Sequence, residues 1–274
     1  MIKMIALDLD NTLLNSQKEI SPANERALKR LHESGIKVVL CTGRPINAIG
    51  HYIDQLDLHQ PDDFTITFNG GLVVNNQTKQ PLYAQGTTKA DLQAVYDYLR
   101  SQGLPMDVLD FDRVYELTEL GPARYKGTVK NIEFVDTTMA DLPGAEHPFA
   151  KAVLATEPAK VTQAKAQVPA AVTAKLRVVQ SQPHILEFLP LGVNKMVGLN
   201  HLLAHFGWQA AELMTFGDAD NDLEMIIGAG DGVVMANGLP AVKAVADHLT
   251  TSNDEDGVAD YLTKTFVKEL QQNK

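Results

Sequence analysis

Residues 3–12 of the chain read KMIALDLDNT. The run from Lys3 to Leu9 is short and nearly continuously apolar, and it ends abruptly in acidic and polar residues. Such a run is typical of a strand buried on both faces of a parallel sheet. Ligands of open α/β sheets bind just beyond the carboxyl ends of the strands. The stretch therefore predicts a parallel sheet with a polar site directly after its first strand.

Outward from this strand, helices and strands alternate. Ser21-Pro22 supplies the N-cap and the first-turn proline of a helix, and the next buried strand covers residues 36–41. A helix is expected over 45–56, and a third strand at 64–68 is followed by the turn residues of a hairpin. This order predicts the α/β class with a doubly wound, Rossmann-like parallel sheet.

The middle of the chain has a different pattern. From Ala84 onward, a helix at 89–101 is followed by short strand-like segments, and the α/β alternation returns only after Pro190, with a helix at 195–206. Insertions are tolerated at surface loops whose ends lie close together. We therefore predict a core domain of residues 1–83 and 190–274, interrupted by an inserted α+β cap domain of residues 84–189 that selects the substrate.

Composition narrows the function. The 274 residues carry 24 Lys and Arg against 34 Asp and Glu, a net charge of -10, which argues against nucleic-acid or membrane-surface partners. Cys41 is the one cysteine, so it is expected to be a small buried apolar residue rather than part of a disulfide. No run is long enough for a signal or a membrane span, which predicts a cytoplasmic protein. No obligate protein partner is inferred.

Four polar segments end a predicted strand or begin a predicted helix on the same side of the core, and they should converge there. They are residues 8–12, Thr42-Gly43-Arg44, Asn194-Lys195 and residues 217–222. Asp8 and Asp10, together with the Gly-Asp-x-x-Asn-Asp loop at 217–222, form a hard-oxygen site of the kind that suits Mg²⁺. The cation would also offset the repulsion between this acidic cluster and a phosphate.

In order along the chain, these motifs resemble those of the haloacid dehalogenase-like superfamily, and more closely its Cof-like phosphatases with an inserted cap of type C2B. Residues 68–70, 192–195 and 252–258 add to the narrower resemblance. It spans the core at both ends of the chain, while the middle matches only as a cap in the expected place. Asn11 stands where Cof-like proteins usually have glycine, and asparagine tolerates the left-handed backbone of such a turn.

The resemblance implies a Mg²⁺-dependent phosphatase that acts on a small phosphorylated metabolite of the sugar phosphate, pyridoxal phosphate or flavin mononucleotide type. Asp8 would be the nucleophile that forms an aspartyl-phosphate, and Asp10 would be the general acid and then the general base. To act first as the general acid, Asp10 must hold a proton near neutral pH, which neighbouring carboxylates or partial burial would favour. Asp218 would complete a metal shell with Asp8 and Asp10.

The resemblance also assigns the phosphate contacts. Thr42 and Gly43 would bind the phosphoryl group, and Asn221 would contact that group or organise its own loop. Arg44 would touch phosphate or substrate, or merely pair with a carboxylate. Lys195 would offer a compact charge to the phosphoryl group and to Asp8, although a lysine at a helix start is in general more often solvated. Asp222, the last residue of the loop at 217–222, would hold Lys195 or a metal-bound water in place.

Two other functions stay open at this point. A phosphotransferase or phosphomutase would use the same aspartyl-phosphate and pass the phosphoryl group to a hydroxyl instead of water. A non-catalytic sensor of a phosphorylated metabolite would keep the fold but replace catalytic residues, and none of them is replaced here. His201 and His205 have the spacing of a metal pair, but no further ligand accompanies them in the sequence, which favours a solvated helix face.

Overall fold

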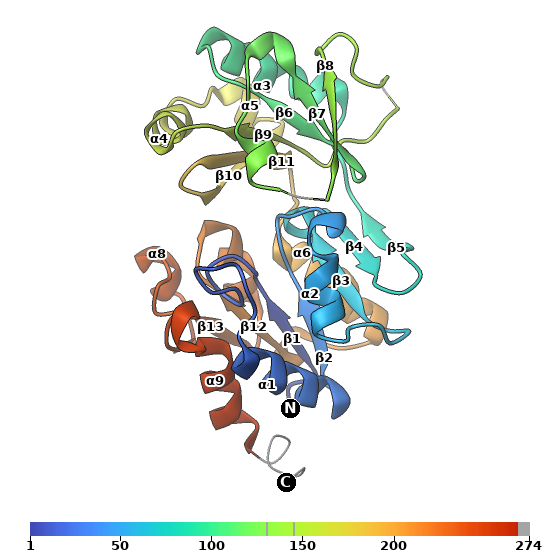
Figure 1. Ribbon diagram of the computed structural model, residues 1–274, viewed down its shortest axis with the longest axis vertical. Helices are drawn as coiled ribbons and strands as arrows, with labels where there is room; N and C mark the ends of the chain where they lie inside the picture. Colours follow the sequence, from blue (N-terminus) through green and yellow to red (C-terminus); the bar gives the residue numbers. More distant parts are fainter. Residues whose placement is uncertain (130, 145, 268–274) are drawn as a thin grey trace. The chain divides into compact units, whose positions relative to one another are not determined.

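The computed structural model describes residues 1–129, 131–144 and 146–267 (Figure 1). The chain divides into two compact units. The core unit comprises Met1–Gly43, Ile49–Tyr83 and Asn194–Lys274, and the inserted unit comprises Arg44–Ala48 and Ala84–Val193. The role of the inserted unit as a substrate-selecting cap stays a prediction.

The core unit is built on a five-stranded sheet in which every pair of neighbours is parallel. Its order is β14-β13-β12-β1-β2, with bounds β1 Met4–Leu7, β2 Lys37–Leu40, β12 Leu213–Gly217, β13 Asp231–Val234 and β14 His248–Leu249. From β1 the chain builds β2 on one side and later returns to build β12 on the other, so the strand order reverses at β1. The predicted doubly wound α/β sheet is confirmed.

Helices cover both faces of this sheet (Figure 1). Helix α1 (Pro22–Glu33) begins after Ser21, whose hydroxyl accepts a hydrogen bond from the Asn24 amide at 3.2 Å, and α9 (Gly257–Thr265) lies beside it. The other face, which carries Met4 and Ala6, packs against α6 (Lys195–Phe206) and α7 (Leu223–Gly228). Because apolar side chains fill both interfaces, β1 is fully buried, as its unbroken apolar sequence predicted.

Two features of the core unit differ from the sequence prediction. The helix expected over 45–56 is a 3-10 turn at Ile46–Ala48 and a short α2 at Gly50–Gln55, interrupted at the fully buried Ile49, whose φ of -123° is not helical. The second difference concerns β3 (Phe64–Thr67), which was expected as the third strand of the parallel sheet. It forms the expected hairpin with β4 (Leu72–Asn75), but together with β5 (Pro81–Ala84) this hairpin makes a separate three-stranded sheet. A single bridge from Cys41 to Ile66 joins β3 to the end of β2.

The inserted unit is an α+β structure, as predicted. Its sheet has the order β10-β11-β9-β6-β7-β8 and is antiparallel except for the pair β7–β8. The bounds are β6 Asp107–Leu109, β7 Arg113–Leu117, β8 Glu133–Thr137, β9 Lys151–Ala155, β10 Leu176–Gln182 and β11 Ile185–Pro190. Helices α3 (Lys89–Ser101), α4 (Pro158–Ala166) and α5 (Ala170–Thr173) share one apolar core with this sheet.

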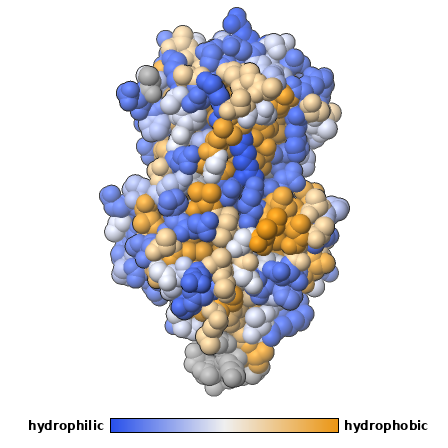
Figure 2. Space-filling view, turned by 180° about the vertical axis from the view of Figure 1, so that it is seen from behind, coloured by the Kyte–Doolittle hydropathy of each residue, from blue (hydrophilic) through white to orange (hydrophobic). Residues whose placement is uncertain are grey.

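The surface mixes polar and apolar residues. On the face shown in Figure 2, polar and charged residues separate the apolar patches. Large exposed apolar side chains such as Leu82, Ile227 and Leu239 lie at separate places in the chain. Within the ranges given above, no helix is both long enough and apolar enough to cross a membrane. Cys41 is fully buried, which confirms the expectation for it.

Candidate active site

The register of the core sheet brings the polar segments to one edge. Leu7 on β1 pairs with Phe216 on β12 and with Leu40 on β2, so the three strands end at the same level. Asp8 and Asp218 follow two of these strands directly, and both are buried. The strand-end rule of open α/β sheets therefore accounts for their meeting, although more than two hundred residues separate them.

Lys195 is fully buried and lies between two carboxylates. Its ammonium donates to an oxygen of Asp8 and, at 2.7 Å, to Oδ1 of Asp222. Burial disfavours the ammonium, but the charges of Asp222 and Asp8 outweigh it and raise the pKa of Lys195 above its ordinary value. The alternative of a solvated helix-start lysine is thus wrong, because two buried carboxylates hold this side chain.

The backbone around Lys195 has little room. Asn194 caps α6 by accepting a hydrogen bond at its Oδ1 from the Val197 amide at 2.9 Å. Gly70 packs against this cap with a φ of +99°, and a Cβ at that position would lie 1.9 Å from the Asn194 carbonyl oxygen. Glycine at position 70 therefore allows the turn after β3 to approach the start of α6.

The Gly-Asp-x-x-Asn-Asp loop folds back on itself through Asp222. Oδ2 of Asp222 accepts hydrogen bonds from the backbone amides of Asp218 at 2.9 Å and Ala219 at 3.0 Å. A Cβ on Gly217 would lie 2.5 Å from the Cβ of Asp222, so glycine is needed where the loop closes. Thr12 orients the other acid, since its hydroxyl donates to Oδ1 of Asp218 at 2.9 Å.

Three buried carboxylates cluster at this edge. Ligand oxygens of Asp8, Asp218 and Asp222 all lie within 4.8 Å of one another. Burial, and then the charges of Asp222, Asp218 and Asp10, raise the pKa of Asp8 well above its usual value, although Lys195 acts in the opposite direction. Burial and the charge of Asp222 likewise raise the pKa of Asp218 to about 7. The cluster holds more negative charge than Lys195 offsets, which is the condition that a bound cation would relieve.

The donors already present distinguish possible metal ligands. Asp222 uses both oxygens for Lys195 and for the loop amides, whereas Asp8 and Asp218 each receive one side-chain hydrogen bond. Asp8 and Asp218 therefore have the better-placed open oxygens for a hard divalent cation. Both belong to the metal shell predicted from the sequence. The side chain of the third predicted ligand, Asp10, lies outside the cluster as defined by these distances.

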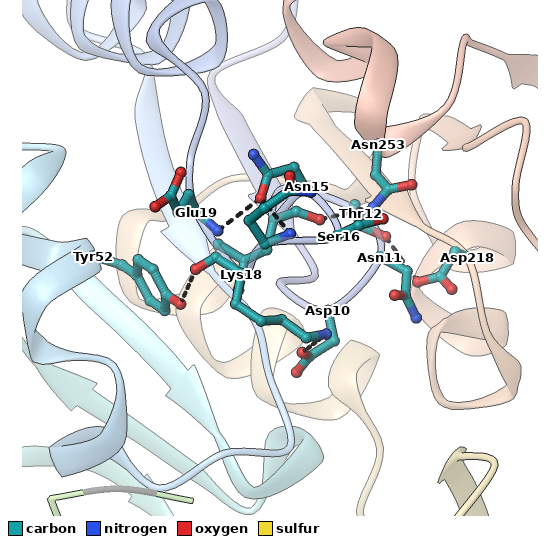
Figure 3. Close-up of polar contacts among 12 residues, drawn as sticks. Asp10, Asn11, Thr12, Asn15, Ser16, Lys18, Glu19, Tyr52, Asp218 and Asn253 are labelled. Atoms are coloured by element: carbon teal, nitrogen blue, oxygen red, sulfur yellow. Dashed lines mark hydrogen bonds and ion pairs between the residues drawn. The ribbon is translucent and has the colours of Figure 1, made fainter. Parts of the chain in front are cut away.

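Asp10 is held instead by a lysine that the sequence reasoning did not single out. Nζ of Lys18 lies 2.8 Å from Oδ1 of Asp10. Figure 3 shows the two side chains paired. Lys18 can reach back because the chain turns sharply at Asn11 and again at Lys18 itself, where the φ values are left-handed at 60° and 63°. The turn at Asn11 therefore has the backbone that the sequence predicted for an asparagine in place of glycine.

Three of the predicted phosphate-binding residues, Thr42, Gly43 and Asn221, meet around Asn69. The Asn69 side chain accepts a hydrogen bond from Nδ2 of Asn221 at 3.1 Å, and its backbone amide donates to the carbonyl of Thr42 at 3.0 Å. A Cβ on Gly43 would lie only 2.9 Å from Nδ2 of the Asn69 side chain, so glycine at position 43 leaves the room that this side chain needs. Arg44 is half-buried and belongs to the inserted unit. The residues Asn-Gly-Gly at 69–71 predicted a turn, and Asn69 indeed has a left-handed φ of 56°. Nothing in the sequence predicted that the Asn69 side chain bonds to Asn221.

Comparison with known proteins places these motifs in a wider context. The model of a family described as haloacid dehalogenase-like hydrolase matches residues 5–262. The Bacillus subtilis protein YxeH is 33% identical over 263 residues, which cover 94% of this chain and 96% of that protein. The 5-amino-6-(5-phospho-D-ribitylamino)uracil phosphatase YitU of the same organism is 30% identical over 281 residues, with 96% and 97% covered.

A solved structure agrees with the sequence relatives. The crystal structure of a haloacid dehalogenase-like hydrolase from Bacteroides thetaiotaomicron superposes with a TM-score of 0.84 at 32% identity. The match covers 97% of this chain and all of that one, at 100%. It therefore includes both units and not only the core sheet.

Proposed function

Because the chain belongs to the haloacid dehalogenase-like hydrolase family and is a phosphoric monoester hydrolase, we propose that it is a Mg²⁺-dependent phosphatase. In this proposal Asp8 is the nucleophile. The observation that carries the proposal is the position of Asp8 at the end of β1, buried against the ammonium of Lys195 and within a cluster of carboxylates. A fixed ammonium orients the nucleophile and faces the charge that develops during phosphoryl transfer.

The chemistry follows from two carboxylates with different roles. An oxygen of Asp8 attacks phosphorus, the bond from phosphorus to the ester oxygen breaks, and Asp10 gives its proton to that leaving oxygen. Asp10 then takes a proton from water, whose oxygen attacks the phosphorus of the aspartyl-phosphate and releases phosphate and Asp8. Lys195 stays paired with Asp222 through both steps, which keeps it aligned with Asp8.

The donor set fits a hard divalent cation. Asp8 and Asp218 would hold Mg²⁺, which, when bound, offsets the negative charge of the phosphate and of the cluster. Asp222 keeps Lys195 and the loop amides in place, and Thr12 keeps Asp218 oriented. Around the phosphoryl group, Thr42, Gly43 and Asn221 supply contacts that are common to all substrates, together with Arg44.

The substrate is a small phosphorylated metabolite. The relative YitU is named for a phosphoester with a polar ribityl chain, and this supports a metabolite of the sugar phosphate, pyridoxal phosphate or flavin mononucleotide type. Apart from Arg44, the groups proposed to bind the shared phosphate belong to the core unit, so the rest of the inserted unit, as a cap, would make the distinction between substrates.

The test is phosphate release from a panel of about a hundred phosphorylated metabolites, with Mg²⁺ and with a chelator. Wild-type protein should release phosphate without any acceptor, whereas Asp8→Asn should release none above background. Asp62→Asn, which changes an exposed carboxylate of the core unit, serves as the matched control. Full activity of Asp8→Asn would refute the nucleophile, and turnover only with an added sugar acceptor would indicate a phosphotransferase.

A further inference from the structure

The loop that carries Asp10, residues 10–19, is fastened to two segments that follow more than two hundred residues later. Nδ2 of Asn253 donates to the carbonyl of Leu14 at 3.0 Å. The carboxylate of Asp254 accepts from the backbone amide of Ser16 at 2.7 Å and from its hydroxyl at 2.6 Å. Nδ2 of Asn237 donates to the carbonyl of Asn11 at 2.8 Å. We refer to Asn237, Asn253 and Asp254 as the clamp.

The clamp is itself a rigid piece of backbone. The amide of Asn253 donates to Oδ1 of Asn237 at 3.0 Å, which joins its two segments. Ser252 and Glu255 cap the turn reciprocally. After the left-handed Asp256, a Cβ on Gly257 would lie 2.3 Å from the carbonyl oxygen of Thr251, so the backbone is tightly folded at this point. Residues 252–258, which the sequence offered only as a family resemblance, thus form a tightly folded turn.

At its far end, the Asp10 loop returns to Asp10. Oδ1 of Asn15 accepts from the amides of Gln17 at 3.0 Å and Glu19 at 2.9 Å, which closes the turn. Figure 3 shows Asn15 beside Glu19. The Tyr52 hydroxyl donates to the Lys18 carbonyl at 2.7 Å, and Lys18 then pairs with Asp10. A continuous series of hydrogen bonds therefore joins the clamp, the loop and Lys18 to Asp10. Asp8 differs, because it directly follows β1, which is paired on both sides.

We propose that the clamp is a positioning device for the general acid: Asn253 and Asp254 hold the Asp10 loop so that Asp10 faces the leaving oxygen of the ester. This inference rests on the proposed function. Thr12, Leu13 and Leu14 are buried, and Thr12 bonds to Asp218, but Asn11 and residues 16–19 are exposed, so the clamp holds the part of the loop that the core does not bury. Loosening the clamp would misplace Asp10 while leaving Asp8 and Lys195 in position.

Two aryl phosphates that differ in leaving group separate these roles. Phenyl phosphate needs a proton on its departing oxygen, whereas 2,4-dinitrophenyl phosphate leaves readily as the anion. The rate of aspartyl-phosphate formation should be measured by rapid quench with enzyme in excess, for Asn253→Asp and Asp254→Ala. With phenyl phosphate we expect a fall of about 10- to 100-fold, within the ~10²–10⁴ that general acid catalysis contributes. With the dinitrophenyl ester we expect a fall of less than about threefold.

The control is Asp260→Ala, which removes a carboxylate on α9 that pairs with Lys264 and makes no hydrogen bond to residues 10–19. It should leave both rates unchanged. Asp254→Glu keeps a carboxylate near Ser16, so it serves if Asp254→Ala does not fold, and it should show the same preference for the dinitrophenyl ester to a smaller degree. Equal losses on the two esters, or no loss on either, would overturn the clamp. Failure of the wild-type protein to form an aspartyl-phosphate with either ester would overturn the proposed function, and the clamp with it.

Discussion

Replacing Asp107 by asparagine is expected to remove a pH dependence of stability that originates in the inserted unit. Asp107 lies on β6, is fully buried, and has no hydrogen-bond partner for either carboxylate oxygen among the described residues. Glu116 on β7 stands directly opposite it. Burial, with a smaller contribution from the charge of Glu116, raises the pKa of Asp107 from 3.8 to about 8.

The sign and size follow from proton linkage. Between these two pKa values the folded protein holds a proton on Asp107 that the unfolded chain has released, so raising the pH favours unfolding. The slope approaches 1.36 kcal/mol for each pH unit, so the free energy of unfolding should fall by about 3 kcal/mol from pH 5 to pH 7 because of this group. This contribution is fully present below the unfolded-state pKa and is lost by the time the pH passes about 8.

Urea unfolding followed by circular dichroism at pH 5, 6, 7 and 8 measures this dependence. Asp107→Asn should have a flatter profile than wild type, and Asp112→Asn, which changes an exposed carboxylate of the same unit, should follow wild type. Trp208, the one tryptophan, lies in the core unit, so a transition seen in circular dichroism but absent from its fluorescence belongs to the inserted unit. Parallel profiles for wild type and Asp107→Asn would refute the reasoning.

Three further predictions concern the active site. Lys195→Met should abolish phosphate release and lower the free energy of unfolding in urea titrations by about 3–5 kcal/mol, because it leaves Asp8 and Asp222 as unpaired buried carboxylates. Unchanged stability would contradict the buried pairing. Gly217→Ala should cost about 1–3 kcal/mol and most of the activity, since the new methyl group displaces Asp222, and a fully active variant would show that the loop adapts. Mg²⁺ at about one hundred times its dissociation constant should stabilise the wild-type protein by ~2.7 kcal/mol in thermal unfolding, and it should not stabilise Asp218→Asn. Equal stabilisation of both proteins would mean that Asp218 is not a ligand of the ion.

Those parts of the fold that depend on local signals were predictable from the sequence. The helix at 195–206 has the predicted ends because Asn194 caps it and Gly207 stops it with a φ of 68°. The strand β8 was not predicted, since it lies at a sheet edge where its residues are only partly buried and its apolar pattern is weak. The break at Ile49 likewise depends on how that side chain is buried, which no local pattern encodes.

The candidate site shows the same division. Asp8 and Asp218 were found because the carboxyl ends of parallel strands meet, and Lys195 because a motif accompanied it. Lys18 carries no motif, and its pairing with Asp10 arises only from two left-handed turns. The link from Asp254 to Ser16 spans 238 positions, so only the folded chain reveals it.

The path of the chain between the two units limits how they could be recombined. The inserted unit ends at Val193, and Lys195 follows after Asn194 alone. A different inserted unit grafted onto this core would therefore have to lead the chain into Asn194 in an extended conformation, next to Gly70, because no linker residues separate the two units here. Splicing at the other junction, after Tyr83, is more forgiving, because β5 there is a largely exposed strand outside the five-stranded sheet.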